Sequence, residues 1–340
     1  MPGESIGEFA LIDRIVARLG EAAARTILVP SGDDAAVWAA PPGAVVATTD
    51  ALVEGNHWRA DTMSMADVGW RAVASNVSDI AAMGATPEQA LLVAVLAPSM
   101  GIEQIDAFID GVAEACLAHG LRVAGGDIVR GSQTAFVVTV LGRAGLQDDG
   151  AARVLRRDAA RVGDAVAVSG HPGAAAAGLA VIEAGRESDP EAGLLLLAHR
   201  RPRARLALGQ AALDAGVRCA LDISDGTLQD LGHIAERSGV GVELRLDALP
   251  LHPAAVALLG RGRACDLALG GGEDYELALA GPPEALAALS TPELPVTVVG
   301  RVVAEHPGEA WALSADGSRY RPPSEGWDQL RSGTTDGAGR

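Results

Sequence analysis

The chain has 340 residues, of which 49% are apolar and only 3% aromatic, and its formal net charge is −17. A chain of this size usually forms more than one core, so we expect two domains with aliphatic cores. The negative charge disfavours binding to nucleic acid or to an anionic membrane surface. All 27 basic residues are arginines, which excludes mechanisms that depend on a phosphate-binding or Schiff-base lysine.

Disulfide and zinc-thiolate chemistry are also disfavoured. The three cysteines, Cys116, Cys219 and Cys265, lie far apart and lack CxxC spacing, a pattern typical of buried, reduced thiols. The N-terminus has no charged segment followed by an apolar run, and no apolar stretch is long enough to span a bilayer. We therefore expect a soluble, cytoplasmic protein.

Helical and strand patterns alternate through the first part of the chain. Apolar residues at helical spacing predict helices, and brief apolar runs bounded by Gly, Asp and Pro predict strands. The predicted helices are 8–19, 65–83 and 102–119, and the predicted strands are 27–29, 35–38, 45–49, 91–96, 121–124 and 136–141.

A polar, nearly aperiodic segment over 147–164 predicts a domain junction. A second alternating pattern follows, with helices over 173–183, 203–215 and 228–238 and strands over 166–168, 219–223, 275–279 and 296–302. We therefore expect an α/β (α+β) fold with a ligand site between its two domains. The expected divisions are domains over 1–147 and 148–330 and a disordered tail over 331–340.

Acidic residues recur where predicted strands end. Asp33 and Asp34 lie between two strands, and Asp50 ends the strand that follows. Asp79 is different, because it lies within an otherwise apolar helix, where an ionised carboxylate is costly unless it is paired or bound to a metal. Three further clusters carry the same residue types: Gly125-Gly126-Asp127, Asp222-Ile223-Ser224-Asp225-Gly226 and Gly270-Gly271-Gly272-Glu273-Asp274. Carboxylates beside glycine-rich turns suit Mg²⁺ with a nucleotide.

Each cluster also has an ordinary structural interpretation, because Asp and Gly are the usual residues of turns and helix caps. Asp225 could cap the helix that follows it. His57 and Trp327 are residue types that are more often structural than functional, and Arg157 could be a solvated linker arginine. The structural interpretation explains poorly why Asp79 lies within an apolar helix.

Taken in order, eight motifs resemble the thiamine-monophosphate kinase family over roughly residues 5–330. They are Gly7-Glu8-Phe9, Gly32-Asp33-Asp34-Ala35, Thr48-Thr49-Asp50, Val53-Glu54-Gly55-Asn56-His57, the run from Asn76 to Ala85, Gly125-Gly126-Asp127, Asp222-Ile223-Ser224-Asp225-Gly226 and the run from Gly271 to Leu277.

The resemblance implies a two-domain fold shared with aminoimidazole ribonucleotide synthetase, N-terminal domains that pair in a homodimer, and a cleft that binds ATP. It implies phosphorylation of thiamine monophosphate to thiamine diphosphate with several Mg²⁺ ions. The implied metal ligands are Asp34, Thr48, Thr49, Asp50, Asp79, Asp127, Asp222 and Asp225. The implied ATP contacts are Gly126, Asp127, Arg157 and Ser224, and the implied substrate contacts are His57, Glu273 and Trp327.

The expected mechanism is direct, in-line transfer with no catalytic side chain, because a phosphate oxygen of the substrate is mostly dianionic at neutral pH. Two alternatives stay open at this point. One is another ATP-dependent enzyme of the same superfamily with a different small-molecule acceptor. The other is a catalytically silent sensor of nucleotide or thiamine phosphate.

Overall fold

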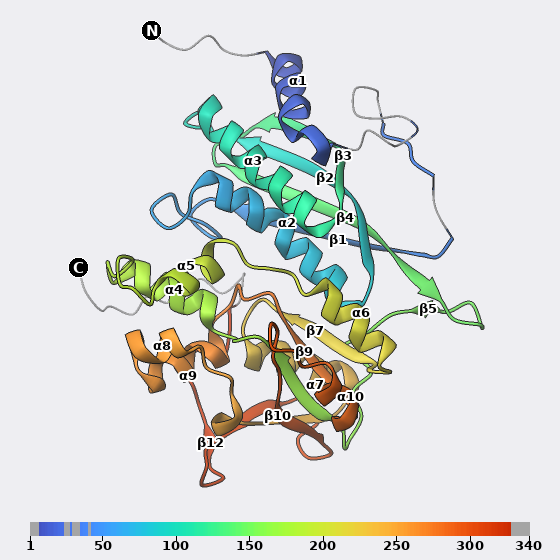
Figure 1. The fold of residues 1–340 in the computed structure, drawn as a ribbon, viewed down its shortest axis with the longest axis vertical. Helices are drawn as coiled ribbons and strands as arrows, with labels where there is room; N and C mark the ends of the chain where they lie inside the picture. The colour runs from blue at the N-terminus through green and yellow to red at the C-terminus, as the bar shows by residue number, and fades with distance from the viewer. Residues whose placement is uncertain (1–6, 24–27, 29–34, 40–41, 328–340) are drawn as a thin grey trace.

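The computed structural model describes residues 7–23, 28, 35–39 and 42–327, and it contains two β-sheets with helices packed on them. Figure 1 shows the first half of the chain above the second half. The expected α/β (α+β) class is confirmed. Asp33, Asp34 and the 331–340 tail lie outside the described residues.

The first sheet has five strands in the order β1-β4-β2-β3, with β5 paired to β4. Its strands are β1 (Ala44–Val53), β2 (Thr86–Leu96), β3 (Arg122–Arg130), β4 (Ala135–Leu146) and β5 (Ala152–Arg153). Helices α2 (Met65–Ala82) and α3 (Ile102–His119) lie against one face of the sheet, and α1 (Glu8–Leu19), which leads into a short 3-10 turn over Gly20–Ala22, packs on α3. The helices predicted over 8–19 and 102–119 are confirmed to the residue.

The strand predicted over 35–38 is wrong, because these residues form only bends and an isolated bridge position. Two of the four are alanine, which has a low preference for strands. In contrast, β1 is longer than predicted and continues past Asp50 to Val53. Asp50 therefore lies within a strand and not at its end.

The second sheet has seven strands in the order β12-β11-β8-β10-β6-β9-β7. They are β6 (Ala165–Ser169), β7 (Cys219–Ile223), β8 (Gly241–Arg245), β9 (Glu276–Gly281), β10 (Val296–Val303), β11 (Ala310–Leu313) and β12 (Arg319–Tyr320). Every residue of β6, β7 and β9 is buried. Strands β6 and β9 lie inside the sheet, whereas β7 is an edge strand that α2 and the helix Thr227–Ser238 cover.

Seven helices of the described chain lie around or beside the second sheet. They are α4 (Ala174–Glu183), α5 (Gly193–Arg200), α6 (Leu206–Asp214), α7 (Thr227–Ser238), α8 (Pro253–Leu259), α9 (Arg261–Gly270) and α10 (Pro283–Ala288), with a 3-10 turn over Leu246–Ala248. Helix α7 packs on β7, β8 and β11, whereas α10 packs on β9 and β10. Helices α4, α5, α8 and α9 cluster beside the sheet around a small core of their own.

Helix α2 lies between the two halves and determines how they meet. A capping box between Ser64 and Asp67 begins this helix, and its residues from Val68 to Ala82 are buried apart from Asp79. Helix α6 of the second half approaches it so closely that a Cβ atom on Gly209 would lie 1.9 Å from the Ala81 carbonyl oxygen. The buried indole of Trp70 donates a 2.7 Å hydrogen bond to the Pro202 carbonyl.

Cys116 and Cys219 are buried, Cys265 is half-buried, and all three are free thiols. Burial raises the pKa of Cys116 and of Cys219 to about 12, so these two remain protonated thiols. Among the described helices, none combines the length and the apolar character needed to cross a membrane.

Candidate active site

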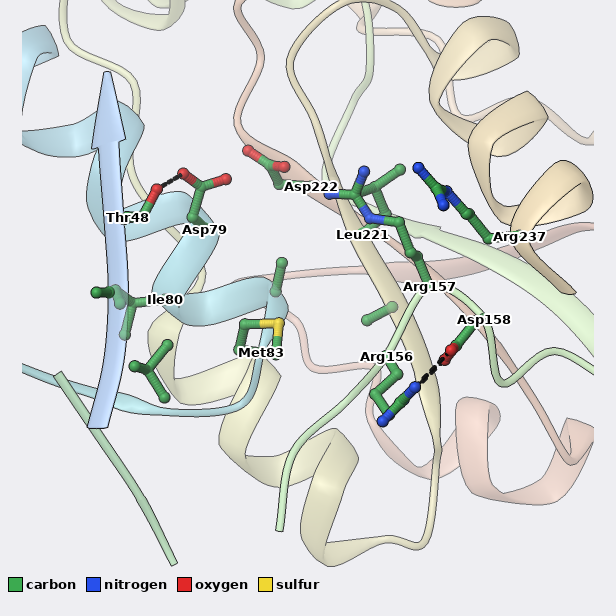
Figure 2. Close-up of a pocket in the computed structure, with 14 residues that line it drawn as sticks. Thr48, Asp79, Ile80, Met83, Arg156, Arg157, Asp158, Leu221, Asp222 and Arg237 are labelled. Carbon is green, nitrogen blue, oxygen red and sulfur yellow. Dashed lines mark hydrogen bonds and ion pairs between the residues drawn. The ribbon is translucent and has the colours of Figure 1, made fainter. Parts of the chain in front are cut away.

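A cavity of about 630 Å³ lies where β1 and α2 of the first half face β7 and α7 of the second half. Figure 2 shows Thr48 and Asp79 on one side of it and Arg157 and Arg237 on another, with Asp222 between them. Apolar side chains, including those of Ile80 and Met83, complete the lining. The cavity therefore has acidic and basic groups on opposite walls.

Alternation along β1 determines which of its side chains face α2. Thr48 and Asp50 share one face of the strand with the buried Leu52, whereas Thr49 lies on the exposed face. The Thr49 hydroxyl bonds the Val138 carbonyl and lies 3.0 Å from the Thr139 hydroxyl. The structure thus brings the side chains of Thr48 and Asp50, but not that of Thr49, towards α2.

Helix α2 carries three polar side chains at a regular spacing of four residues. Arg71, Ser75 and Asp79 are four residues apart and lie on one face of the helix. Asp79 accepts a 2.5 Å hydrogen bond from the Thr48 hydroxyl. Burial raises the pKa of Asp79, and the bond from Thr48 and the charge of Arg157 oppose that shift.

The acids on this side of the cavity repel one another. Burial raises the pKa of Asp222 well above its usual range, and the nearby Asp79 raises it further. Burial raises the pKa of Asp50 to about 6, with Asp79 again the second cause, and a hydrogen bond with Ser75 opposes the shift. Three carboxylates in a shared, partly buried region thus lack enough positive charge, a situation that a bound cation relieves.

The opposite wall carries three arginines, of which Arg156 alone forms an ion pair among the described residues. Arg156 pairs with Asp158 at 2.5 Å. In the part of the chain that the structure describes, neither Arg157 nor Arg237 forms an ion pair, although many other arginines do. Figure 2 shows both guanidinium groups on the cavity wall. Unpaired arginines at a cavity are suited to bind an anion such as a phosphate.

Beyond Asp50 lies a second group of polar residues. The charges of Glu273 and His57 both influence the pKa of Asp50, so these side chains lie within electrostatic reach of it. His57 accepts a 3.1 Å hydrogen bond through Nδ1 from the Val53 backbone, which fixes its ring. Glu273 forms a 2.8 Å ion pair with Arg71. Two predicted substrate residues, His57 and Glu273, are therefore brought to the same side of the site.

The start of α7 forms another acidic corner. Asp230 accepts three backbone hydrogen bonds, from Ser224, Asp225 and Gly226, at 3.0–3.1 Å. Burial, followed by the charge of Asp225, raises the pKa of Asp230 to about 7. Ligand atoms of Asp225, Asp230 and His233 lie within 4.8 Å of one another, and they are the one such group among the described residues. The acids Asp50, Asp79 and Asp222 are spaced more widely.

Other predicted residues are not brought to the cavity. Gly126 and Asp127 lie within β3, at the opposite edge of the sheet from β1, and Asp127 bonds the Ile128 backbone at 2.9 Å. Trp327 is 50% exposed and lies against the start of α7, where its backbone N–H bonds the Asp225 carbonyl at 3.0 Å. Asp34 lies outside the described residues. The functional roles of these residues stay predictions.

Sequence reasoning missed Arg71, Arg237, Asp230 and His233. A signal for Arg71 was available, because it lies eight residues before Asp79, and so on the same helical face, in an otherwise apolar segment. No comparable pattern marks Arg237, which reaches the cavity through the packing of α7 against β7.

Comparisons with known proteins place this geometry in a family. A model described as AIR synthase related protein, N-terminal domain, matches residues 32–144, and its C-terminal counterpart matches residues 161–312. The curated thiamine-monophosphate kinase of Salmonella typhimurium is 36% identical over 309 residues, which cover 89% of this chain and 92% of that protein.

Solved structures agree with these matches. The thiamine-monophosphate kinase of Stenotrophomonas maltophilia is 37% identical, with a TM-score of 0.80, and the match covers 93% of this chain and 98% of the other. AaThiL complexed with AMPPCP and TMP is 31% identical, with a TM-score of 0.73 over 96% of this chain and 98% of the other. Both the family models and these relatives span most of the chain, and the chain therefore belongs to the AIR synthase related family and, within it, to the thiamine-monophosphate kinases.

Proposed function

We propose that the chain transfers the γ-phosphoryl group of ATP to thiamine monophosphate, forming ADP and thiamine diphosphate. The observation that carries the proposal is the cavity with carboxylates on one wall and, on the other, two arginines that form no ion pair with a described residue. Its volume of about 630 Å³ is within the usual range for small-molecule sites. The named relatives and the complex with AMPPCP and TMP support both substrates.

ATP would lie in this cavity with its phosphates towards Arg157 and Arg237. A chain of charge −17 without lysine must offset phosphate charge with arginine and metal ions. Ser224, with its backbone at the start of α7, would add a contact there. Gly126 and Asp127 remain proposed ATP contacts that the single chain does not bring to the cavity.

The carboxylates fit Mg²⁺. Asp50, Asp79 and Asp222, with the hydroxyl of Thr48, offer the hard oxygen ligands that this ion prefers. The raised pKa of each carboxylate reflects burial without sufficient positive charge nearby. When bound, Mg²⁺ would neutralise charge on the transferring phosphate. Asp225 would be a further ligand, and Asp34, Thr49 and Asp127 remain proposed ligands.

The acceptor would lie on the side of His57 and Glu273. The phosphate group of the acceptor is mostly dianionic at neutral pH, so its attacking oxygen needs no general base. The side chains therefore have to orient the acceptor, and they do not have to activate it. Asp50 interacts with both His57 and Glu273 and also with Asp79, which places the acceptor side next to the carboxylates. Trp327 would close the substrate side from the C-terminal segment.

The proposed working form is a homodimer of two-domain chains, divided at residues 147 and 148. The edges of the first sheet are long strands, β1 with 10 residues and β3 with 9, and Val45 and Val129 are exposed on them. Such edges are usually covered in native proteins. A second copy paired along this sheet would also account for the predicted role of Asp127. A cytoplasmic location stays a prediction of the sequence.

An acceptor panel tests the proposed function. The chain is mixed with Mg-ATP and either thiamine monophosphate, free thiamine or buffer, and products are separated by chromatography. We expect thiamine diphosphate only with thiamine monophosphate. Product from free thiamine alone, or ATP hydrolysis without transfer in every mixture, would refute the assignment of the acceptor.

A further inference from the structure

Arg71 is one of the most deeply buried charged residues of the described chain, with only 1% of its surface exposed. Its Nη1 atom forms a 2.8 Å ion pair with Glu273 across the boundary between the two halves. Its Nη2 atom donates to the His199 carbonyl oxygen, and Nη1 lies 3.4 Å from the His57 carbonyl oxygen. One guanidinium thus connects α2 with α5, with the loop that carries His57 and with Glu273.

The groups around Arg71 leave Glu273 as its ionic partner. His199 lies beside the guanidinium, and burial followed by the charge of Arg71 lowers the pKa of His199 to about 3. The imidazole is therefore neutral at physiological pH. Among the described residues, Glu273 is the carboxylate that pairs with Arg71. An unpaired cation at this depth would be costly, so the pair constrains both side chains.

The backbone around Glu273 requires such a constraint. Glu273 and Tyr275 have φ angles of 69° and 54°, in the left-handed region that side chains other than glycine rarely adopt. The Glu273 backbone bonds the Ser224 carbonyl at 2.7 Å, and the Tyr275 hydroxyl donates to the Glu273 carboxylate at 3.2 Å. Strained residues of this kind persist only where the surrounding structure holds them, and they gather at functional sites.

We infer that Arg71 is a positioning residue that holds the Glu273 carboxylate, and with it the acceptor side of the site, in its binding orientation. This inference rests on the proposed function, in which Glu273 contacts thiamine monophosphate. Arg71 itself is too deeply buried to touch the acceptor, so it acts through Glu273. Because the three contacts of Arg71 join both halves of the chain, the position of its guanidinium depends on whether the two halves are docked.

Four variants test this role by initial rates at varied substrate concentrations. Arg71→Met keeps the length of the side chain but removes its charge, and we expect the KM for thiamine monophosphate to rise about tenfold or more while the KM for ATP changes less than about twofold. Arg71→Lys restores the charge without the planar fork and should lie between wild type and Arg71→Met. Glu273→Gln should raise the KM for thiamine monophosphate about as much as Arg71→Met does. The double variant should raise this KM no further than either single substitution.

Arg201→Met is the matched control. Arg201 also spans the two halves, where it pairs with Asp67 at 2.6 Å and with Glu114 at 2.7 Å, but it does not contact Glu273. We expect this control to lower thermal stability without a selective change in the KM for thiamine monophosphate. The inference would be overturned if Arg71→Met changed the KM for thiamine monophosphate and the KM for ATP equally. It would also be overturned if the effects of Arg71→Met and Glu273→Gln on the KM for thiamine monophosphate multiplied in the double variant.

The outcomes separate the two proposals. A wild-type chain that forms no thiamine diphosphate sinks the proposed function, whereas an active wild type with an unaffected Arg71→Met variant sinks only the positioning role. Thermal unfolding of wild type, Arg71→Met, Glu273→Gln and the double variant forms a double-mutant cycle that needs no substrate. A positioning role requires the Arg71 and Glu273 substitutions to be coupled in that cycle, and independent effects would contradict it.

Discussion

Asp79→Asn separates the function of the carboxylates from their effect on stability. The substitution keeps the size of the side chain and an oxygen that can accept the hydrogen bond from Thr48. It removes one negative charge from a region where burial and mutual repulsion already raise the pKa of Asp50 and Asp222. We expect turnover to collapse while the fold is retained.

The expected size of each effect follows from these contacts. Loss of about 3 kcal/mol of charge stabilisation at the transferring phosphate corresponds to a rate reduced roughly 150-fold. Without Mg²⁺, relief of repulsion offsets any weakening of the hydrogen bond, so the free energy of unfolding should stay within about 1 kcal/mol of wild type. With Mg²⁺ at 100 times its dissociation constant, wild type should gain about 2.7 kcal/mol, and the variant should lose most of this gain.

The assay pairs initial rates with thermal unfolding, measured in EDTA and in excess Mg²⁺. Asp148→Asn, on the exposed turn between β4 and β5, is the control and should behave like wild type in both measurements. Turnover of Asp79→Asn close to wild type would refute the metal assignment. A variant that unfolds in EDTA would instead refute the argument that repulsion makes this carboxylate costly.

Three further predictions concern the cavity, the buried acids and the interface. Arg157→Ala should raise the KM for ATP more than about tenfold with little change for the acceptor, as steady-state rates would reveal. Burial raises the pKa of Asp274 to about 8, so the folded state retains a proton that the unfolded chain releases near 3.9, and the stability from this group is lost as pH rises from about 4 to 8. Asp274→Asn should therefore show a smaller fall in Tm between pH 5 and 8 than wild type. A dependence of Tm on pH identical to that of the control Asp148→Asn would contradict this. Gly209→Ala should lower the free energy of unfolding by about 1–3 kcal/mol, because its Cβ would meet the Ala81 carbonyl at 1.9 Å, and unchanged denaturant midpoints would contradict it.

Long periodic helices were the most predictable part of the fold. The patterns over 8–19 and 102–119 match α1 and α3 to the residue, because each buries one apolar face over several turns. Short elements such as α5, α8 and β12 were not predicted, since their few residues carry too little periodicity. The strand over 35–38 failed because a short apolar run does not ensure a continuous ladder, and these residues reach only an isolated bridge position.

The site was predictable where local sequence and topology agree. An acid within an apolar helix drew attention to Asp79, which lines the cavity, and its role as a metal ligand stays a prediction. Its neighbours Arg157 and Asp222 reach the same cavity only through the packing of the two halves, which no local pattern encodes. The family resemblance implied both Thr48 and Thr49 as metal ligands, although a strand sends adjacent side chains to opposite faces. The distance of Asp127 from the cavity likewise follows from strand order, which the sequence does not display.

Transfer of the γ-phosphoryl group tests the central claim most directly. The chain is incubated with Mg²⁺, thiamine monophosphate and ATP that is radiolabelled at the γ-phosphate, and the label is followed through separated products. We predict that the label enters thiamine diphosphate in a one-to-one ratio with the ADP formed, with little release of free phosphate. Label recovered only as inorganic phosphate, or ADP formed without labelled thiamine diphosphate, would contradict the account.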